Sequence, residues 1–272
     1  MMRSLWTAAS GMISQQTNVD TISNNIANVN TTGYKKETAE FKSLLYQTIQ
    51  AKTTSANGET KPVGAQVGLG VRTSSITSIF EQGNMNETQV DTDFAIEGDG
   101  FFSVRGLDGE TYYTRNGSFK WTVGPNGVML ANSDGLPVLD TTGVAIELDP
   151  NEYDISKVVV WGNGSICYPD EQNNAKPIGI QMALTQFSNP AGLEKEGDSL
   201  YRTSEASGDP VLEVEDDELK KSRLRQGYLE ASNVQLVDEM VNLIVAQRAY
   251  EMNSKAIVAS DEMLSQANNL KR

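Results

Sequence analysis

Apolar side chains recur at alternating steps of four and three residues through the first part of the chain. This spacing is the a/d pattern of a coiled-coil seam, and it predicts one continuous helix over residues 1–30. The positions of this first seam are Met1, Leu5, Ala8, Met12, Gln15, Val19, Ile22, Ile26 and Val29. A helix with such a stripe needs a partner that covers it.

The last part of the chain, residues 226–272, repeats the same spacing and is expected to form a second helix. Its seam consists of Leu236, Met240, Leu243, Gln247, Tyr250, Ser254, Ile257, Asp261, Leu264 and Asn268. A second apolar stripe lies on another face and consists of Val234, Val237, Val241, Ile244, Met252, Ala256, Met263 and Leu270. Two apolar stripes on one helix predict two packing partners.

The polar face of the N-terminal helix carries almost no charge, because Asp20 is the single charged residue between Leu5 and Val29. A solvent-facing helix usually interleaves Lys with Glu, and a membrane-surface helix carries Lys and Arg, so neither pattern fits. Two arrangements account for the stripes: an intramolecular helix pair that caps a globular domain, or packing between copies of the chain. The uncharged polar face favours packing between copies, because amides can hydrogen-bond across buried contacts.

The hydrophobic period changes in the middle of the chain, over residues 71–225. Short runs rich in β-branched and aromatic residues, such as DFAIE, GFFSVR and KVVVWG, alternate with turn dipeptides. These dipeptides tolerate the positive φ of tight hairpins, and they are Asp108-Gly109, Asn116-Gly117, Asn126-Gly127, Asp134-Gly135 and Asn163-Gly164. The pattern predicts a central all-β domain of antiparallel strands, in a sandwich or a loosely wound barrel.

Residues 31–70 follow neither period and are rich in Gly, Thr and Ser, so we expect an extended connector. The predicted fold class is α+β: N- and C-terminal coiled-coil-type helices paired into one helical domain, with a central all-β (antiparallel) domain. The expected boundaries are 1–30 for the N-terminal helix, 31–70 for the connector, 71–225 for the β domain and 226–272 for the C-terminal helix.

Composition argues against most enzyme classes and several kinds of partner. The sequence contains no histidine, which removes imidazole bases and histidine-ligated zinc sites. A formal net charge of −14 without a basic cluster disfavours nucleic acid and anionic membrane surfaces. We expect no catalytic residues, no cofactor and no metal site. A pair of carboxylates would suffice for a glycosidase, but nothing in the sequence singles out a pair.

Three further features have plain structural interpretations. Cys167, the single cysteine, is expected to be a small, semi-buried apolar residue. The acidic run at residues 213–218 is expected to be solvated. The N-terminal residues lack the unbroken apolar core of a signal peptide, and no stretch approaches the roughly 20 apolar residues of a membrane span. We therefore expect no membrane insertion and no use of the general secretory route.

Two stretches resemble a known family. Residues 23–35, SNNIANVNTTGYK, closely resemble the N-terminal signature shared by the axial proteins of the bacterial flagellum, which are the rod and hook subunits. Residues 229–257 are similar to the C-terminal signature of the same family. The matching positions are Asn24, Asn25, Ala27, Asn28, Thr32, Gly33, Tyr34, Ser232, Asn233, Val234, Gln247, Arg248, Ala249 and Tyr250.

The resemblance implies a structural subunit of a hollow helical tube, with paired terminal helices inside and the β domain outside. It implies export through the flagellar type III apparatus, a place in the basal-body rod that crosses the periplasm, and a role in motility. The implied partners are copies of the chain, proximal rod subunits, hook subunits and surrounding ring proteins. The residues expected in the assembly helices are Leu5, Met12, Val19, Ile22, Ile26, Val29, Leu236, Met240, Leu243, Tyr250, Ile257 and Leu264.

Among the members of the family, the connector and the C-terminal end most resemble the distal rod subunits. Residues 47–67 are expected to stiffen the tube by filling the space between neighbouring subunits, and a hook subunit should lack them. The alternatives are a proximal rod or hook subunit, or a secreted carbohydrate-active β protein with helical ends.

Overall fold

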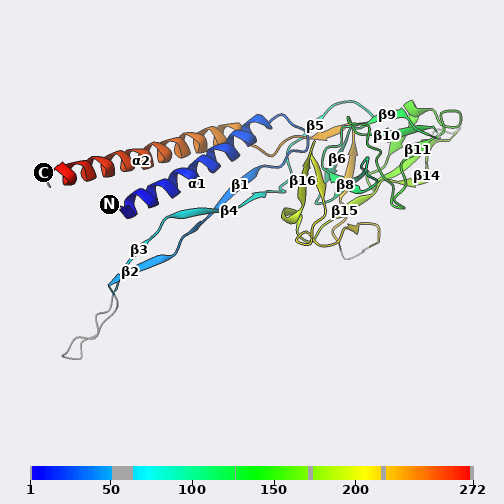
Figure 1. Ribbon diagram of the computed structural model, residues 1–272. Helices are drawn as coiled ribbons and strands as arrows, with labels where there is room; N and C mark the ends of the chain where they lie inside the picture. Colours follow the sequence, from blue (N-terminus) through cyan, green and yellow to red (C-terminus); the bar gives the residue numbers. More distant parts are fainter. Residues whose placement is uncertain (1, 51–63, 126, 171–173, 216–218, 270–272) are drawn as a thin grey trace. The chain divides into compact units, whose positions relative to one another are not determined.

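The structure is a computed structural model that describes residues 2–50, 64–125, 127–170, 174–215 and 219–269 (Figure 1). The chain divides into two compact units, which are described separately. The helical unit contains Met1–Ala27, Glu37–Ser78 and Gln235–Arg272. The β unit contains Asn28–Lys36 and Ile79–Val234. The chain passes from one unit to the other several times, so neither unit is a continuous stretch of sequence.

Two long helices form the helical unit: α1, Met2–Ala27, and α2, Leu236–Asn269. They lie side by side and run antiparallel, since Ser4 near the start of α1 contacts Ser260 near the end of α2 (Figure 1). Asp238 and Glu239 lie in the first turn of α2, where negative side chains interact favourably with the helix dipole. Neither helix is long and apolar enough to cross a membrane.

Two antiparallel ribbons complete the described part of the helical unit. The strands β1, Glu37–Ser43, and β4, Val71–Ser78, pair with one bulge between Glu40 and Phe41. The strands β2, Tyr46–Gln50, and β3, Ala65–Gly68, pair farther along the same segment. The segment expected as an extended connector thus consists largely of extended, paired strands where it is described. Residues 51–63 of the expected stiffening segment lie outside the described residues.

Both helices are shorter than the periodicity predicts. Helix α1 ends at Ala27, and a turn follows over residues 28–30. The start of the C-terminal helix was expected at residue 226, but β19, Arg223–Gln226, and β20, Tyr228–Glu230, occupy that place. These strands pair with β6, Phe94–Glu97, and β5, Met85–Glu87, because Leu224 and Glu230 are buried in the β unit.

Every strand pair of the β unit is antiparallel, as the sequence predicts. A six-stranded sheet has the order β16-β17-β8-β7-β15-β18, and two three-stranded sheets have the orders β11-β10-β9 and β12-β13-β14. The six-stranded sheet consists of β7, Phe101–Arg105; β8, Thr111–Thr114; β15, Leu184–Gln186; β16, Glu194–Gly197; β17, Leu200–Arg202; and β18, Val211–Leu212. The others consist of β9, Lys120–Val123; β10, Val128–Ala131; β11, Glu147–Leu148; β12, Val159–Val160; β13, Ser165–Pro169; and β14, Ala175–Gln181.

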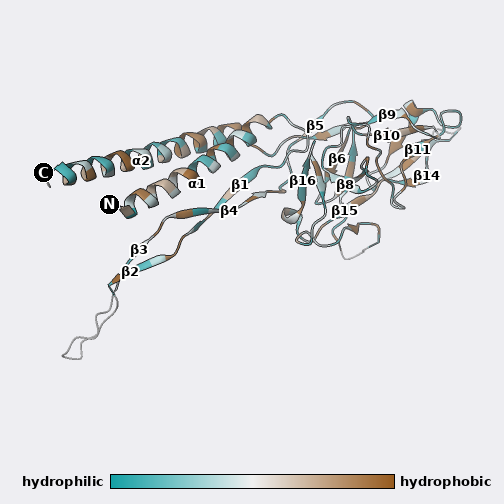
Figure 2. Ribbon diagram, viewed as in Figure 1, coloured by the Kyte–Doolittle hydropathy of each residue, from teal (hydrophilic) through white to brown (hydrophobic). Residues whose placement is uncertain are grey.

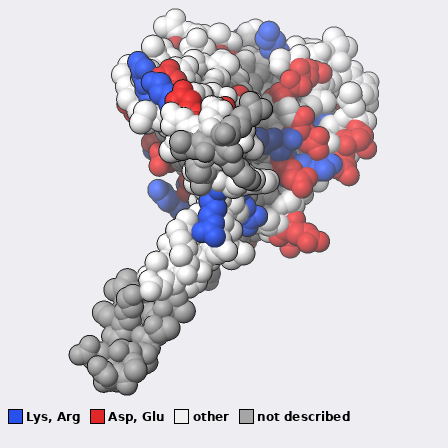
Figure 3. Space-filling view, turned by 60° about the vertical axis from the view of Figure 1, so that its left-hand side comes forward, with Lys and Arg blue, Asp and Glu red and all other residues white. Residues whose placement is uncertain are grey.

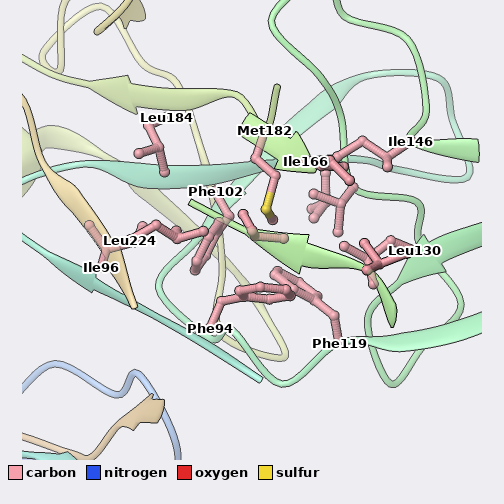
Figure 4. Close-up of a cluster of buried hydrophobic side chains, with 14 of the residues drawn as sticks. Phe94, Ile96, Phe102, Phe119, Leu130, Ile146, Ile166, Met182, Leu184 and Leu224 are labelled. Atoms are coloured by element: carbon pink, nitrogen blue, oxygen red, sulfur yellow. The ribbon is translucent and has the colours of Figure 1, made fainter. Parts of the chain in front are cut away.

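The β unit has two apolar clusters, one on each face of β7. Phe102 and Val104 belong to the larger cluster, which Figure 4 shows with Met182 among its members. Phe101 points to the other face and joins an aromatic cluster with Tyr201, in which the two ring centroids are 6.1 Å apart. Side chains of a strand alternate between its faces, so the adjacent Phe101 and Phe102 fill different cores.

The turn signals are largely confirmed. Gly109, Gly135 and Gly164 adopt φ angles of +85°, +81° and +85°, which the predicted tight turns require. Gly117 is not among the glycines with positive φ; its carbonyl oxygen instead accepts a hydrogen bond from Phe94 N at 2.9 Å. Asn126 lies outside the described residues.

The prediction that the acidic run at residues 213–218 is solvated was wrong for Glu213, whereas Glu215 is exposed and residues 216–218 lie outside the described residues. Glu213 is buried, and its carboxylate accepts hydrogen bonds from Ser222 N, Ser222 Oγ and Gln186 Nε2 at 2.7, 2.7 and 2.8 Å. Polar residues nearby in space offset its desolvation, which the run of charges in the sequence could not indicate. Cys167, expected to be semi-buried, is completely buried, and burial raises the pKa of its thiol.

Replacing Phe102 by Ala tests the central position of the larger cluster. The side chain has no exposed surface, so its removal leaves a cavity and should lower the free energy of unfolding by about 3–5 kcal/mol. Leu107→Ala is the matched control, because Leu107 is almost fully exposed and its loss should change stability by less than about 0.5 kcal/mol. Denaturant titration monitored by near-UV circular dichroism measures both values, and equal stabilities for the two variants would contradict this assignment of the core.

Candidate assembly site

Small side chains form the contact between α1 and α2. Ala8 and Ser14 of α1 and Ala246 and Ser260 of α2 are buried. A Cβ atom added at Gly11 would lie 2.8 Å from Nδ2 of Asn253 on α2, so this glycine permits the close approach of the helices. Ala8 belongs to the predicted seam, whereas Ser14, Ala246 and Ser260 lie beside it, so the buried contact includes smaller side chains than the heptad pattern predicts.

Asn25 joins three segments of the helical unit. Its Nδ2 donates to the backbone oxygen of Glu37 at 2.8 Å and to Oε2 of Glu239 at 3.0 Å. Its Oδ1 accepts a hydrogen bond from the backbone N of Glu37 at 2.9 Å. The side-chain amide thus makes the two hydrogen bonds to Glu37 that a neighbouring strand would make, and it also bonds to Glu239 in the first turn of α2. Asn25 and Glu239 are both almost completely buried, so these bonds are made away from water.

Large apolar side chains lie on the outside of the helix pair. Figure 2 shows hydrophobic positions along the length of both helices. Within the single chain, Trp6 and Ile13 of α1 are exposed by 73% and 67%. The exposed apolar side chains of α2 are Leu236, Val237, Met240, Val241, Ile244, Val245, Tyr250, Met252, Val258 and Met263. Exposed apolar surfaces of this extent are typical of interaction sites.

A groove of about 390 Å³ lies on the helical unit, between the two helices. It is lined by Gln16 and Val19 of α1 and by Gln247, Tyr250 and Glu251 of α2. Gln247 and Tyr250 belong to the C-terminal family signature and are exposed in the single chain. Two amides and a tyrosine around an apolar floor can receive a side chain that is partly polar, such as those of a neighbouring helix.

The β unit contains a buried cluster of charges at Glu230. Oε1 of Glu230 accepts hydrogen bonds from Lys35 Nζ at 2.6 Å and from Gly83 N at 2.9 Å, and Oε2 lies 3.5 Å from Nη1 of Arg115. The guanidinium of Arg115 also lies over the ring of Phe101, 5.0 Å from its centroid. Burial lowers the pKa of Lys35, and the Glu230 carboxylate opposes that shift. The cluster ties the incoming chain at residue 35 to the outgoing chain at residue 230.

Two signature residues, Gly33 and Asn233, contact neighbouring backbone in the part of the β unit where the chain enters and leaves it. Gly33 has a φ of +69°, and a Cβ atom there would lie 2.7 Å from the backbone of Arg115 and Asn116. Oδ1 of Asn233 accepts a hydrogen bond from Lys36 N at 2.7 Å, and its Nδ2 donates to the backbone oxygen of Ile79 at 2.9 Å. These residue types are therefore required for geometric reasons: one must lack a side chain, and the other must both donate and accept.

The structure places the predicted assembly residues unevenly. Ile22 is buried, while Leu5, Met12, Val19, Ile26, Val29, Leu243, Ile257 and Leu264 are half-buried. Leu236, Met240 and Tyr250 are exposed in the single chain, so the assembly role of all these positions stays a prediction. Sequence reasoning did not single out Glu239, Arg115 or Glu230. Glu230 and Lys35 are 195 residues apart, and no local pattern signals their contact.

The remaining charges are mainly on the surface. In the view of Figure 3, acidic side chains occur over much of the described surface, with basic side chains between them. Among the described residues, no group of three His, Cys, Asp or Glu side chains is placed to hold a metal ion.

Asn25→Ala tests the hydrogen-bonded junction of the helical unit. The variant leaves the Glu37 backbone groups and the buried Glu239 carboxylate without this partner, which should cost about 2–5 kcal/mol. Ser23→Ala is the matched control, because Ser23 is exposed on the same helix and should lose less than about 0.5 kcal/mol. Thermal unfolding followed by far-UV circular dichroism compares them, and an unchanged transition for Asn25→Ala would refute the junction.

Glu230→Gln tests the buried charge cluster. Removing the carboxylate leaves Lys35 and Arg115 buried without an opposite charge, so the free energy of unfolding should fall by about 3–5 kcal/mol. Glu97→Gln breaks a surface ion pair with Arg225 and should cost at most about 1 kcal/mol. Urea titration of both variants measures the difference. If Glu230→Gln lowers the free energy of unfolding no more than Glu97→Gln does, the cluster does not stabilise the β unit.

Comparison with known proteins agrees with this arrangement. Three family descriptions match parts of the chain: "Flagella basal body rod protein" over residues 5–35, "Flagellar hook protein FlgE/F/G D1 domain" over residues 95–168, and "Flagellar basal body rod FlgEFG protein C-terminal" over residues 225–270. The first and last contain the two signature stretches, and the middle one lies in the β unit.

Full-length relatives bear names of the same kind. The flagellar basal-body rod protein FlgG of Borreliella burgdorferi is 48% identical over 274 residues, which covers 100% of both chains. The FlgG proteins of Caulobacter vibrioides and Bacillus subtilis are 42% and 37% identical and cover 99% and 100% of this chain and 100% of their own. The chain therefore belongs to the flagellar basal-body rod proteins and is a structural subunit of the rod.

Proposed function

We propose that this rod subunit assembles with copies of itself into a hollow helical tube, as a distal rod subunit that transmits motor torque to the hook. The single observation that carries the proposal is the apolar outer face of α2. The tube would also pass exported subunits through its lumen. No catalytic step is part of this function.

The exposed face of α2 supports packing between copies. Val237, Val241 and Ile244 lie at steps of four and three residues and are exposed by 72%, 54% and 55%. They match the second stripe of the heptad pattern, whereas the first contact of α2 is already made with α1. Covering such side chains is favourable by about 1.5–3 kcal/mol each, and the gain recurs in every subunit of a helical assembly.

The remaining partners follow from the place of a distal rod subunit within the basal body. They are proximal rod subunits at one end, hook subunits at the other, surrounding ring proteins and the flagellar type III export apparatus. The antiparallel helix pair supports this proposal, because both of its helices carry exposed apolar side chains. A subunit with a copy stacked above and below it needs such contact surfaces at several places.

The distal position is favoured over a proximal rod or hook position by the ribbon of β2 and β3. Every residue of β2 is exposed in the single chain, and Leu45, Tyr46 and Ile49 are large apolar side chains near or within it. A two-stranded ribbon is marginally stable alone, so this one needs a neighbour to pack against. Filling the space between neighbours would lock them and keep the tube straight.

Ile244→Asp tests assembly through α2. The residue is exposed in the monomer, so the β unit and the helix pair should fold normally, whereas a carboxylate desolvated in the tube wall costs several kcal/mol per subunit. Val123→Asp introduces the same charge at a side chain that is 87% exposed on β9 of the β unit, and it is the matched control. The measurement is swimming speed and the yield of rods in a flagellated host that depends on this chain.

We expect at least a tenfold loss of rods for Ile244→Asp and little change for Val123→Asp. Circular dichroism of both purified variants confirms that they fold. Straight rods and normal swimming with Ile244→Asp would refute assembly through this face.

A further inference from the structure

In the described part of the chain, four backbone connections link the helical unit to the β unit. They follow residues 27, 36, 78 and 234, where the chain passes from one unit to the other. On the β side they lead into three segments, which we call the junction segments: residues 28–36, which carry two of the connections, residues 79–84 and residues 228–234. Force that the backbone conducts between the units therefore enters the β unit through these segments.

Lys35 connects its own junction segment to the other two. Its Nζ donates to the backbone oxygen of Glu81 at 2.8 Å and to Oε1 of Glu230 at 2.6 Å. The same Oε1 accepts a hydrogen bond from Gly83 N at 2.9 Å. Lys35 and Glu230 are each 1% exposed, so water does not compete for these bonds. One buried ion pair thus contacts all three junction segments.

Asn233 makes a second connection among the same segments. Its Oδ1 accepts a hydrogen bond from Lys36 N at 2.7 Å, and its Nδ2 donates to the backbone oxygens of Ile79 at 2.9 Å and Glu81 at 3.2 Å. Ile79 N also donates to the backbone oxygen of Lys36 at 2.8 Å. Lys36 and Ile79 are the β-unit residues directly at two of the connections. The Asn233 amide therefore holds the backbone where it enters and leaves the unit.

Arg115 joins the junction segments to the interior of the β unit. Its Nη1 lies 3.5 Å from Oε2 of Glu230, and its Nη2 donates to the backbone oxygen of Gly98 at 2.8 Å. Its guanidinium lies 5.0 Å from the ring centroid of Phe101, which belongs to the aromatic cluster. Gly33 N adds a backbone bond to the oxygen of Glu230 at 2.8 Å. The junction is therefore continuous with a packed core.

The polar character of these contacts indicates a role other than stability. The cost of taking opposite charges out of water can exceed their attraction, and apolar side chains of similar volume are often as stabilising or more so. Hydrogen bonds to charged groups differ from apolar contacts in having a short distance and a preferred direction. They can therefore fix the backbone of three segments at defined positions against a pull along the chain.

We infer that Lys35, Glu230 and Asn233 form a mechanical joint that makes the four connections act together. A pull on one junction segment is passed to the other two through these side chains, and from Glu230 through Arg115 to the core. Segments that were bonded separately to the β unit would detach one after another. The inference rests on the proposed transmission of torque, because it names the residues through which force enters the β unit.

Stretching single molecules of the full chain in optical tweezers tests the joint. In a Cys167→Ala background, one handle pair spans the junction, at Thr38→Cys on β1 and Val123→Cys on β9. The other pair lies within the β unit, at Leu107→Cys and Val123→Cys. The three handle positions have exposed side chains. At constant force, Asn233→Ala should detach about tenfold faster than the unmodified chain with the first pair, because the lost bonds lower the barrier.

The direction of pulling separates a joint from general stability. With the handles at Leu107 and Val123, Asn233→Ala should change the rate of unfolding by less than about twofold. Gln186→Ala is the matched control, because its Nε2 donates to Oε1 of Glu213 and to the backbone oxygen of Lys220, both at 2.8 Å, and neither partner lies in a junction segment. It should leave the rate across the junction within about twofold of the unmodified chain.

Equal acceleration by Asn233→Ala with both handle pairs would overturn the joint, because it indicates a loss of stability throughout the β unit. No acceleration across the junction would overturn it as well. Neither result bears on whether the chain assembles into rods, and failure of the unmodified chain to form rods would instead contradict the proposed function.

Rotation against a viscous load tests the joint in assembled rods. Among motors that carry a filament, those with Asn233→Ala should lose it about fivefold more often in a viscous medium than those with Gln186→Ala, because forced detachment depends on the rate of opening under load. The difference should disappear in a medium of low viscosity. Filament loss that is the same at both viscosities, or the same for both variants, would overturn the joint.

Discussion

The close approach of two antiparallel helices determines the architecture of the helical unit. It is possible because the facing positions are small: Gly11 lies against Asn253, and Ser4 bonds to Ser260. Ile22 of α1 is buried, but many of the large apolar side chains of α2 lie on the outside of the pair. Exposed apolar side chains promote aggregation of a monomer. In a rod, a neighbouring subunit can cover each outer face of the helix pair.

The polar residues of the N-terminal signature have a structural explanation in these contacts. Asn25 replaces a strand partner for Glu37 and also bonds to Glu239, so it joins the end of α1, the start of β1 and the start of α2. Asn233 and Glu230 have the corresponding role in the β unit, where they bind the backbone at residue 36 and the ammonium of Lys35. Each of these side chains fixes the direction of the chain where it enters or leaves an element.

Much of this fold could be predicted from periodicity and turn residues. The helices follow from heptad spacing, and the antiparallel β unit follows from short β-type runs and from turns such as Asp108-Gly109. The family followed from the signature residues. What could not be predicted was the identity of the seam, because a/d spacing does not distinguish neighbouring faces of α2, and Glu239 rather than Met240 is buried. The Glu230 cluster could not be predicted either, because Lys35, Arg115 and Glu230 come from distant parts of the sequence and only the fold brings them together.

We propose that the outer face of α2 is a contact surface between subunits of the rod. Electron cryomicroscopy of basal bodies isolated from cells that depend on this chain measures it directly, through a helical reconstruction at side-chain resolution. We expect Val237, Val241 and Ile244 to lose most of their exposed surface against helices of adjacent subunits. A rod in which these three side chains face the lumen or the surrounding solvent would contradict it.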